Sequence, residues 1–170
     1  MEDQIILVDK KDNQVGTEGK LAAHQKALLH RAFSIYIFND KGEVLIQRRN
    51  KNKYHSGGLW SNTCCSHPRD EEDIELAIYR RLKEEMDFDC EMRKIFDILY
   101  RCEFDNGLTE NEFLHVFVGK YSGEVTANPE EAEAWKWMNA TDLLVDVKTN
   151  PEKYSYWLIK CIEKVLENAP

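Results

Sequence analysis

The sequence lacks any apolar run that approaches the ~20 residues of a membrane-spanning helix, so we expect no membrane segment. Its first residues mix acidic side chains with one short apolar run, Ile5–Val8. They have neither the basic start nor the long apolar middle of a signal peptide. We therefore expect a cytoplasmic protein whose first strand is this apolar run.

An excess of positive charge is also missing. The chain has 23 Lys and Arg against 31 Asp and Glu, a formal net charge of −8. Because nucleic-acid binding relies on clustered cations against phosphates, this balance disfavours a nucleic-acid partner. An anionic substrate would need local cations or bound metals to overcome the negative field of the whole protein.

The five cysteines contain no C-x-x-C pair, so we do not expect a structural zinc knuckle. An odd number of cysteines in a chain without an export signal favours reduced thiols. Linkers rich in proline or glycine, repeats and low-complexity tracts are missing as well, and we treat residues 1–170 as one domain. We expect a monomer.

Strand-like and helical patterns follow one another along the chain, which predicts an α/β fold. Residues 32–38 and 44–49 are predicted strands, and the turn-forming residues Asn39–Gly42 between them predict a hairpin. Further strands are predicted over 94–103, 110–120 and 134–138, and helices over 72–86, from 141, and over 154–168. Residues 50–68 are predicted to form a long loop that carries function.

The predicted helix over 72–86 has an unusual apolar stripe. Apolar residues recur there at steps of three and four, as a helix that packs on a core requires. An advance of ~100° per residue puts Arg81 and Glu85 near the middle of this stripe. The pattern leaves two interpretations open: an internal ion pair between the two residues, or a metal-binding role for Glu85.

The order of residues from Ser66 to Phe88 resembles the Nudix box. The matching positions are Ser66, Glu72, Arg80, Arg81, Leu82, Lys83, Glu84, Glu85, Met86, Asp87 and Phe88. The spacing is intact, but Ser66 and Asp87 stand where the box has glycines, and Arg81 stands where it has its first glutamate. The last change removes one carboxylate from the metal cluster of a diphosphate hydrolase, which argues against hydrolysis.

The loop Ser56–Pro68, with the sequence SGGLWSNTCCSHP, resembles the active-site loop of type I isopentenyl diphosphate isomerases. Further matches to that family are Gly19–His24, Leu29–Phe33, Glu110–Glu112 and Tyr154–Trp157. Several separated motifs in one order are far more specific than a single short pattern. The resemblance implies a Nudix-like α/β/α sandwich with a mixed sheet. It also implies interconversion of isopentenyl and dimethylallyl diphosphate, a step of isoprenoid precursor biosynthesis.

The resemblance further implies a site for one divalent metal, with the ligands His24, His30, His67, Glu110 and Glu112. The residue pattern agrees in part, because Glu110 and Glu112 lie two apart and share one face of a strand. Imidazole and carboxylate ligands suit Zn, Mn or Fe better than Ca. Taken alone, each histidine is more often a surface or core residue than a ligand. His55 and His115 match no motif, and we interpret them as structural or exposed.

By the same resemblance, Glu85 holds a second metal, Mg, together with the diphosphate of the substrate. The cations expected to clamp that diphosphate are Lys20, Arg49, Lys53 and Arg81. The two lysines are also compatible with a solvated surface position, which is the commoner place for lysine. Arg49 ends a predicted strand beside the long loop, and Arg81 points inward, so both arginines fit a clamp better.

The reaction adds a proton at one carbon and removes one from another, through a tertiary carbocation, and so needs an acid and a base. The family resemblance assigns these positions to Cys65 and Glu112, with Tyr100 as hydrogen-bond partner of the glutamate and Trp157 as the aromatic face toward the cation. Cys65 lies two residues before His67, so we expect the metal and the clamp to lower its pKa and favour thiolate. The other four cysteines, and Trp60, Trp135 and Trp137, are interpreted as core residues.

Two other functions compete with the isomerase. A Nudix hydrolase of a nucleotide-linked diphosphate would share the helix over 72–86 but would not need Cys65, His24 or His30. A noncatalytic domain that senses a diphosphate or a metal would share the fold. The presence of an acid, a base and a metal-ligand set favours an enzyme over such a domain.

Overall fold

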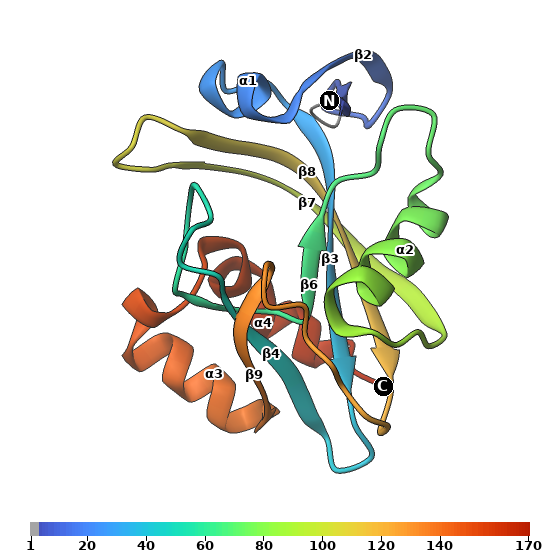
Figure 1. Ribbon diagram of the computed structural model, residues 1–170, viewed down its shortest axis with the longest axis vertical. Coiled ribbons are helices and arrows are strands. Elements are labelled where there is room, and N and C mark those ends of the chain that lie inside the picture. The colour runs from blue at the N-terminus through green and yellow to red at the C-terminus, as the bar shows by residue number, and fades with distance from the viewer. Residues whose placement is uncertain (1–3) are drawn as a thin grey trace.

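The structure is a computed structural model that describes residues 4–170, so the first three residues of the expected 1–170 domain lie outside the described part. It contains one nine-stranded sheet flanked by helices (Figure 1). The strands are β1 Gln4–Val8, β2 Gln14–Gly19, β3 His30–Phe38, β4 Glu43–Arg49, β5 Trp60–Ser61, β6 Cys64–Ser66, β7 Met92–Glu103, β8 Thr109–Lys120 and β9 Ala132–Asn139. The helices are α1 Lys20–Gln25, α2 Ile74–Met86, α3 Ala140–Thr149, the 3-10 turn Pro151–Lys153, and α4 Tyr156–Glu167.

Strand β3 lies at the centre of the sheet. It pairs in parallel with β8, from His30 opposite Glu112 to Phe38 opposite Lys120, and antiparallel with β6. Residues 32–38 are all buried, as expected for a strand that is covered on both faces. The mixed sheet predicted from the sequence is therefore confirmed.

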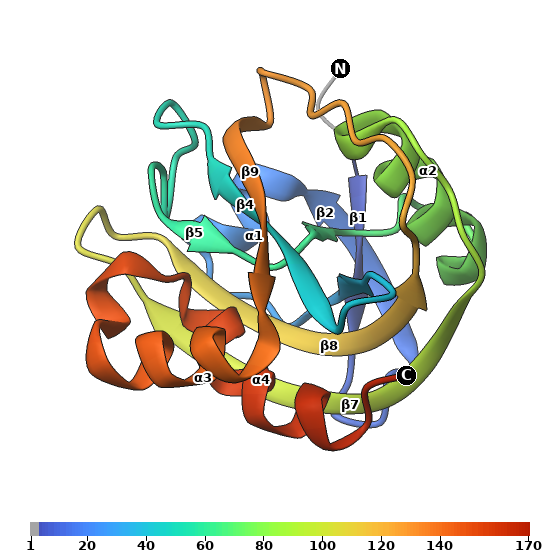
Figure 2. The ribbon, with the colours of Figure 1, turned by 90° about the horizontal axis from the view of Figure 1, so that it is seen from below.

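The two faces of the sheet are covered by different helices. Helix α2 packs on one face, where Ile78 and Leu82 meet Phe33 and Ile35. Helices α3 and α4 lie on the opposite face (Figure 2), over a cluster that includes Tyr36. Each large side chain buried in these layers contributes roughly 1.5–3 kcal/mol. The α/β/α sandwich expected from the resemblance is confirmed.

Helix α2 has defined signals at both ends. The side chain of Asp73 caps its first turn by accepting a hydrogen bond from the Glu75 backbone N–H at 2.8 Å. Asp87 ends the helix with a left-handed backbone at φ 58°, a conformation that Asp tolerates better than most residues other than Gly. This explains why Asp87 fits where the Nudix box has glycine.

Several features of the structure differ from the sequence prediction. Strand β2 and helix α1 were not expected, because their residues show neither clear alternation nor a long helical period. The predicted loop 50–68 contains β5 and β6. Strand β6 pairs with β3 along the edge where the predicted hairpin would have placed β4. Consequently β3 and β4 pair only at Phe38 and Val44, and β4 pairs mainly with β9. Trp135 is 37% exposed, so its interpretation as a core residue was wrong.

No helix in the stretch 4–170 is both long and apolar enough to cross a membrane.

Candidate active site

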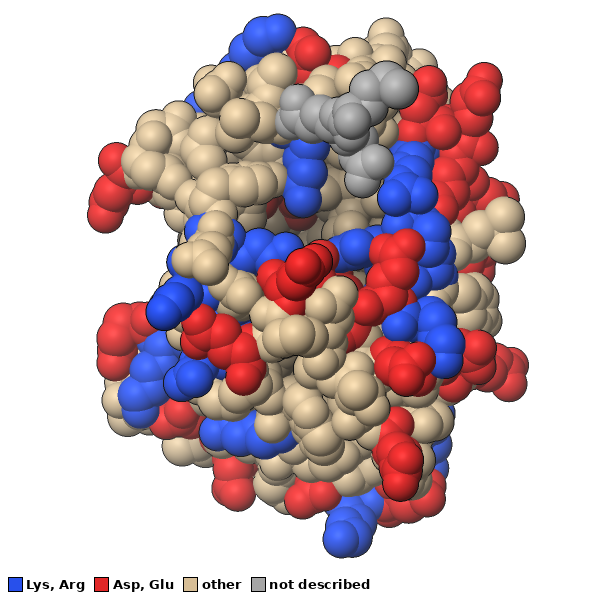
Figure 3. All heavy atoms as spheres, in the orientation of Figure 1, with Lys and Arg blue, Asp and Glu red and all other residues tan. Residues whose placement is uncertain are grey.

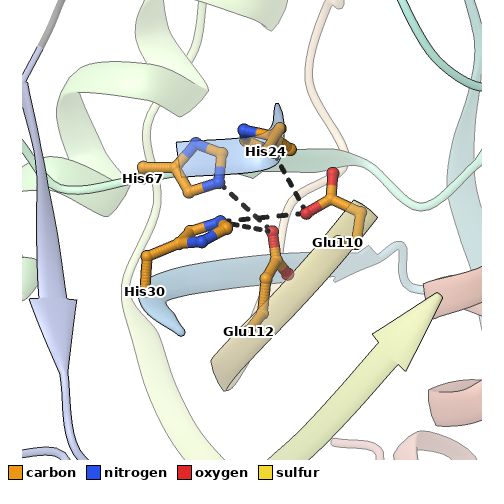
Figure 4. A group of neighbouring side chains, drawn as sticks. All are labelled: His24, His30, His67, Glu110 and Glu112. Atoms are coloured by element: carbon orange, nitrogen blue, oxygen red, sulfur yellow. Dashed lines mark hydrogen bonds and ion pairs between the residues drawn. The ribbon is translucent and has the colours of Figure 1, made fainter. Parts of the chain in front are cut away.

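Five polar side chains converge at one end of the sheet (Figure 4). They are His24 from α1, His30 from β3, His67 just after β6, and Glu110 and Glu112 from β8. One nitrogen or oxygen atom from each lies within 4.8 Å of all the others, and all but the half-buried His67 are buried. The five residues expected to bind a metal are thus brought together from four separate elements.

The histidine rings in this cluster are oriented by backbone carbonyls. Nδ1 of His24 lies 2.6 Å from the Lys20 carbonyl, and Nδ1 of His30 lies 2.8 Å from that of Leu28. A carbonyl oxygen only accepts, so each Nδ1 carries a proton, and in the neutral form of each ring the lone pair of Nε2 faces the carboxylates. Burial lowers the pKa of His30 to about 4, which keeps this ring neutral at pH 7.

These lone pairs face acceptors rather than donors. Nε2 of His24 lies 3.2 Å from Oε2 of Glu110, and Nε2 of His30 lies 3.6 Å from Oε1 of Glu112. Among residues 4–170, both nitrogens and Oε2 of Glu110 are buried without a hydrogen-bond partner. Two nitrogen lone pairs and a carboxylate oxygen that point at one another need a cation between them. The residues present therefore fit a divalent metal.

The pKa values of the two carboxylates in the cluster are shifted in opposite directions. Burial raises the pKa of Glu112 well above its usual range, and the neighbouring negative charge of Glu110 adds to this shift. Burial opposes ionisation of Glu110 too, but the neighbouring imidazoles of His24 and His55 outweigh it and hold its pKa well below the usual range. Without a cation the pair therefore holds one proton on Glu112.

A pocket of about 650 Å³, counting its part open to solvent, lies beside this cluster. Its face carries Lys and Arg side chains around a hollow (Figure 3). Of the residues singled out in the sequence, those that line the pocket are Lys20, Arg49, Lys53, Cys65, His67, Arg81, Glu85, Tyr100, Glu110, Glu112 and Trp157. The metal-site and clamp candidates and both proton-transfer candidates are thus neighbours in space.

Cys65 is held by polar neighbours but stays a thiol. Its S–H donates to Oδ1 of Asn62 at 2.9 Å, and the Ser34 hydroxyl donates to its sulfur at 3.5 Å. Burial raises the pKa of Cys65 to about 11, and the opposing effects of Ser34 and Arg49 are smaller. The protein groups alone therefore favour the thiol, in contrast to the thiolate expected from the sequence.

The opposite carboxylate, Glu112, is held from two sides. The Tyr100 hydroxyl donates to its Oε2 at 2.7 Å, and Nε2 of His67 lies 3.2 Å from its Oε1. Tyr100 lies directly opposite Glu112 in the β7–β8 pair. This register explains why a residue twelve positions away in the sequence reaches the carboxylate.

Trp157 forms part of the pocket wall. Its indole N–H donates to Oγ of Ser61 at 3.0 Å, and this bond fixes the plane of the buried ring. The guanidinium of Arg49 lies over the ring at 5.0 Å from its centroid. The face of the indole is therefore already arranged to stabilise a cation.

The clamp cations are partly neutralised by carboxylates. Arg81 donates to Oε1 of Glu85 at 2.6 Å and to Oε1 of Glu131 at 3.2 Å, and Lys53 forms an ion pair with Glu131. Burial lowers the pKa of Lys20, and the nearby charge of Lys53 lowers it further. The ion pair between Glu85 and Arg81 that one interpretation predicted is formed, and the carboxylate of Glu85 also lines the pocket.

Several pocket residues were missed in the sequence. Gln47 donates to Oε2 of Glu85 at 3.0 Å and lies two positions before Arg49, on the same face of β4, so the strand period could have indicated it. Glu131 and His55 lie in segments without a periodic pattern, and nothing in the sequence marked them. His55 was interpreted as structural or exposed, yet it is buried, lines the pocket and contacts Glu110.

His115 lies apart from this pocket. Its Nε2 is 2.9 Å from Oδ2 of Asp12, and its Nδ1 is 3.0 Å from Oδ1 of Asp97. These contacts link the β1–β2 turn to β7, which agrees with a structural role.

Comparison with known proteins gives consistent matches over nearly the whole chain. A family model described as the NUDIX domain matches residues 28–158. The chain is 55% identical over 166 residues to Isopentenyl-diphosphate Delta-isomerase 2 of Aromatoleum aromaticum, covering 98% of this chain and 88% of the relative. It is 46% identical over 164 residues to the Isopentenyl-diphosphate Delta-isomerase of Burkholderia multivorans, covering 96% of this chain and 93% of the relative.

Solved structures support the fold. The crystal structure of DR0079 from Deinococcus radiodurans superposes with a TM-score of 0.80 at 17% identity, covering 95% of this chain and 98% of that one. A MutT NUDIX hydrolase from Burkholderia pseudomallei superposes with a TM-score of 0.65 at 21% identity, covering 81% of this chain and 98% of that one. At these identities the likeness concerns the fold alone.

Proposed function

Because the chain belongs to the isopentenyl-diphosphate Delta-isomerases of the NUDIX domain family, we propose that it interconverts isopentenyl and dimethylallyl diphosphate in the pocket described above. In this reaction a proton is added to the terminal carbon of the double bond, which leaves a tertiary carbocation. A proton is then lost from the adjacent methylene. The diphosphate stays intact throughout.

One observation carries the proposed mechanism. Cys65 on β6 and Glu112 on β8 reach the same pocket from strands that flank β3 on opposite sides. A short alkenyl chain that lies across β3 therefore has a proton-transfer group near each side. Cys65 holds its proton as a thiol, and the Tyr100 hydroxyl orients the carboxylate of Glu112.

Trp157 has a different part in this mechanism. Its ring belongs to the pocket wall, its N–H is occupied by Ser61, and the guanidinium of Arg49 shows that its π face receives a cation. A desolvated cation–π contact is worth about 2 kcal/mol or more. We propose that this contact stabilises the carbocation between the two proton transfers.

We propose that His24, His30, His67, Glu110 and Glu112 hold one divalent metal, with Zn, Mn or Fe as the candidates. When bound, that metal would supply the positive charge that the buried carboxylates and the imidazole lone pairs lack. Glu85 would contribute its carboxylate to Mg bound with the diphosphate. Lys20, Arg49, Lys53 and Arg81 would hold the diphosphate itself.

The rival hydrolase function has less support. The position of the first Nudix-box glutamate is occupied by Arg81, whose guanidinium is paired with Glu85 at 2.6 Å. A cation there reduces the negative charge available to bind the several metal ions that diphosphate hydrolysis uses. Cys65 and Trp157 have no evident part in an attack on phosphorus.

Incorporation of solvent deuterium tests the proposal. The protein is incubated in D₂O with isopentenyl diphosphate, Mg and a divalent metal for the histidine site, and the products are followed by mass spectrometry. We expect dimethylallyl diphosphate that carries deuterium and no released phosphate, since the added proton comes from a side chain that exchanges with water. Phosphate release without deuterium uptake would identify a hydrolase. Bound substrate with neither result would identify a noncatalytic domain.

The cellular setting is also a proposal. Such a reaction belongs to isoprenoid precursor biosynthesis. We propose that the protein acts on a small diphosphate and that residues 1–170 form a single domain. We propose a cytoplasmic monomer that has no nucleic-acid partner, which agrees with the net charge of −8.

A further inference from the structure

His55 contacts the candidate metal centre although it is not one of the five converging ligands. Its Nε2 lies 2.7 Å from Oε1 of Glu110, and its ring is buried. The other oxygen of Glu110, Oε2, lies 3.2 Å from Nε2 of His24 and has no hydrogen-bond partner in the described part of the chain. The two oxygens of Glu110 are therefore used differently: one is held by His55, and the other faces the lone pairs of the cluster.

The contact between His55 and Glu110 has a defined direction. Glu110 is one of the proposed metal ligands and must be ionised in that role, and an ionised carboxylate only accepts hydrogen bonds. Nε2 of His55 must therefore carry the proton and donate it. A bond to a charged acceptor at 2.7 Å is short and strong for an N–H donor, so it fixes the rotation of the carboxylate.

The ring of His55 is itself held in place by its neighbours. It stacks on Phe104 with centroids 4.9 Å apart and an interplanar angle of 1°, and it meets Trp157 edge-on at 5.8 Å. Tyr54 contacts it edge-on at 4.9 Å. A donor held by three aromatic rings presents its N–H in one direction, as a positioning residue requires.

We propose that His55 is a positioning residue of the metal centre, which turns Glu110 so that Oε2 faces the cation. The inference rests on the proposed metal site and deepens it. His55 acts through Glu110 and does not ligate the metal, because its Nε2 is occupied by Glu110 and it lies outside the group whose ligand atoms converge. Loss of such a supporting hydrogen bond typically weakens metal binding by about 10- to 100-fold.

Two substitutions separate the N–H donor from the ring. His55→Phe keeps an aromatic ring for Phe104 and Trp157 but removes the donor. His55→Gln removes the ring but offers an amide N–H at a similar distance from the backbone. His115→Phe is the matched control, because His115 is also buried and paired with carboxylates, Asp12 and Asp97, but lies away from the cluster.

The measurement is the Zn²⁺ affinity of the metal-stripped proteins, by competition with a chromophoric chelator. We expect His55→Phe to weaken Zn²⁺ binding by about 10- to 100-fold. His55→Gln should retain most of the affinity, and His115→Phe should equal the parent. The thermal unfolding of each metal-free variant shows that it is folded. The absorption spectrum of the Co²⁺ form should be the same in His55→Gln and the parent, since the ligands are the same.

Each other outcome is decisive. Parent-like affinity in His55→Phe would overturn the inference, and so would an equal loss in His55→Phe and His55→Gln, because the ring and not the donor would then matter. A changed Co²⁺ spectrum in His55→Gln would make His55 a ligand. If the parent itself binds no Zn²⁺, the proposed centre fails and this inference fails with it. If the parent binds Zn²⁺ and the loss is confined to variants of His55, the proposed centre is supported whether or not the inference about His55 holds.

Discussion

Replacement of Tyr100 by Phe removes one hydroxyl from a buried contact of the pocket. That hydroxyl donates to Oε2 of Glu112 at 2.7 Å, and the tyrosine side chain is only 8% exposed. No described contact of Tyr100 involves the clamp cations. The substitution therefore removes support from the proposed proton-transfer carboxylate and leaves the diphosphate site as it was.

The size of the effect follows from the part that Tyr100 has in orienting Glu112. A hydrogen bond to a neutral group contributes about 0.5–1.5 kcal/mol and one to a charged group about 1.5–3 kcal/mol. Without the hydroxyl the carboxylate can leave the orientation that proton transfer needs, and we expect the barrier to rise by about 1–2 kcal/mol. At 1.36 kcal/mol for each factor of ten, kcat should fall roughly 5- to 30-fold while KM stays nearly constant.

The assay is the steady-state conversion of isopentenyl diphosphate by the parent and by Tyr100→Phe at saturating metal. Tyr154→Phe is the matched control, because the hydroxyl of this buried residue also bonds a carboxylate, that of Asp146, and the residue does not line the pocket. An unchanged kcat in Tyr100→Phe would refute the orienting role. An effect confined to KM would show that Tyr100 acts in binding.

Three further predictions concern other residues of the site. Cys65→Ala should lower kcat by at least ~100-fold, because proton transfer by a side chain typically contributes 10²–10⁴, whereas Cys64→Ala should keep most of the activity; equal losses would contradict the assignment. Arg49→Ala and Arg81→Ala should raise KM by roughly 10-fold or more with a smaller change in kcat, since a charged hydrogen bond contributes about 1.5–3 kcal/mol in ground and transition states alike. Burial lowers the pKa of His30 from 6.5 to about 4, so the unfolded chain takes up this proton first as the pH falls. The metal-free protein should therefore lose roughly 3 kcal/mol of its free energy of unfolding between pH 7 and pH 4 through this residue; urea unfolding that shows the same loss in His30→Gln would exclude this cause.

The periodicity of strands and helices allowed part of the site to be predicted from the sequence. The spacing of Glu110 and Glu112 placed both on one face of a strand, and β8 has them so. The helical period likewise turned Arg81 and Glu85 inward, where α2 carries their ion pair. A regular element fixes the direction of each side chain once its period is known, and this is why these positions could be predicted.

Residues in irregular segments offered no comparable signal. His55 follows Arg49 by six positions without strand or helix between them, so its direction depends on the path of the loop over Phe104 and Trp157. Glu131 faces Lys53 only because β9 pairs with β4, a contact between segments about 80 positions apart. The pairing of β6 with β3 was hidden for a similar reason, since a three-residue strand is too short to show alternation.

Arg81 connects the one change of a Nudix-box carboxylate to the proposed change in chemistry. A glutamate at its position would have placed another carboxylate beside Glu84, Glu85 and Glu131, and such a group of carboxylates would need several cations to be stable. The guanidinium instead forms ion pairs with all three, at 2.7, 2.6 and 3.2 Å. Under the proposed function, this positive charge would hold the diphosphate oxygens, and fewer metal ions would gather beside them. The diphosphate would then serve to bind the substrate, and the proposed proton transfers would be left to Cys65 and Glu112.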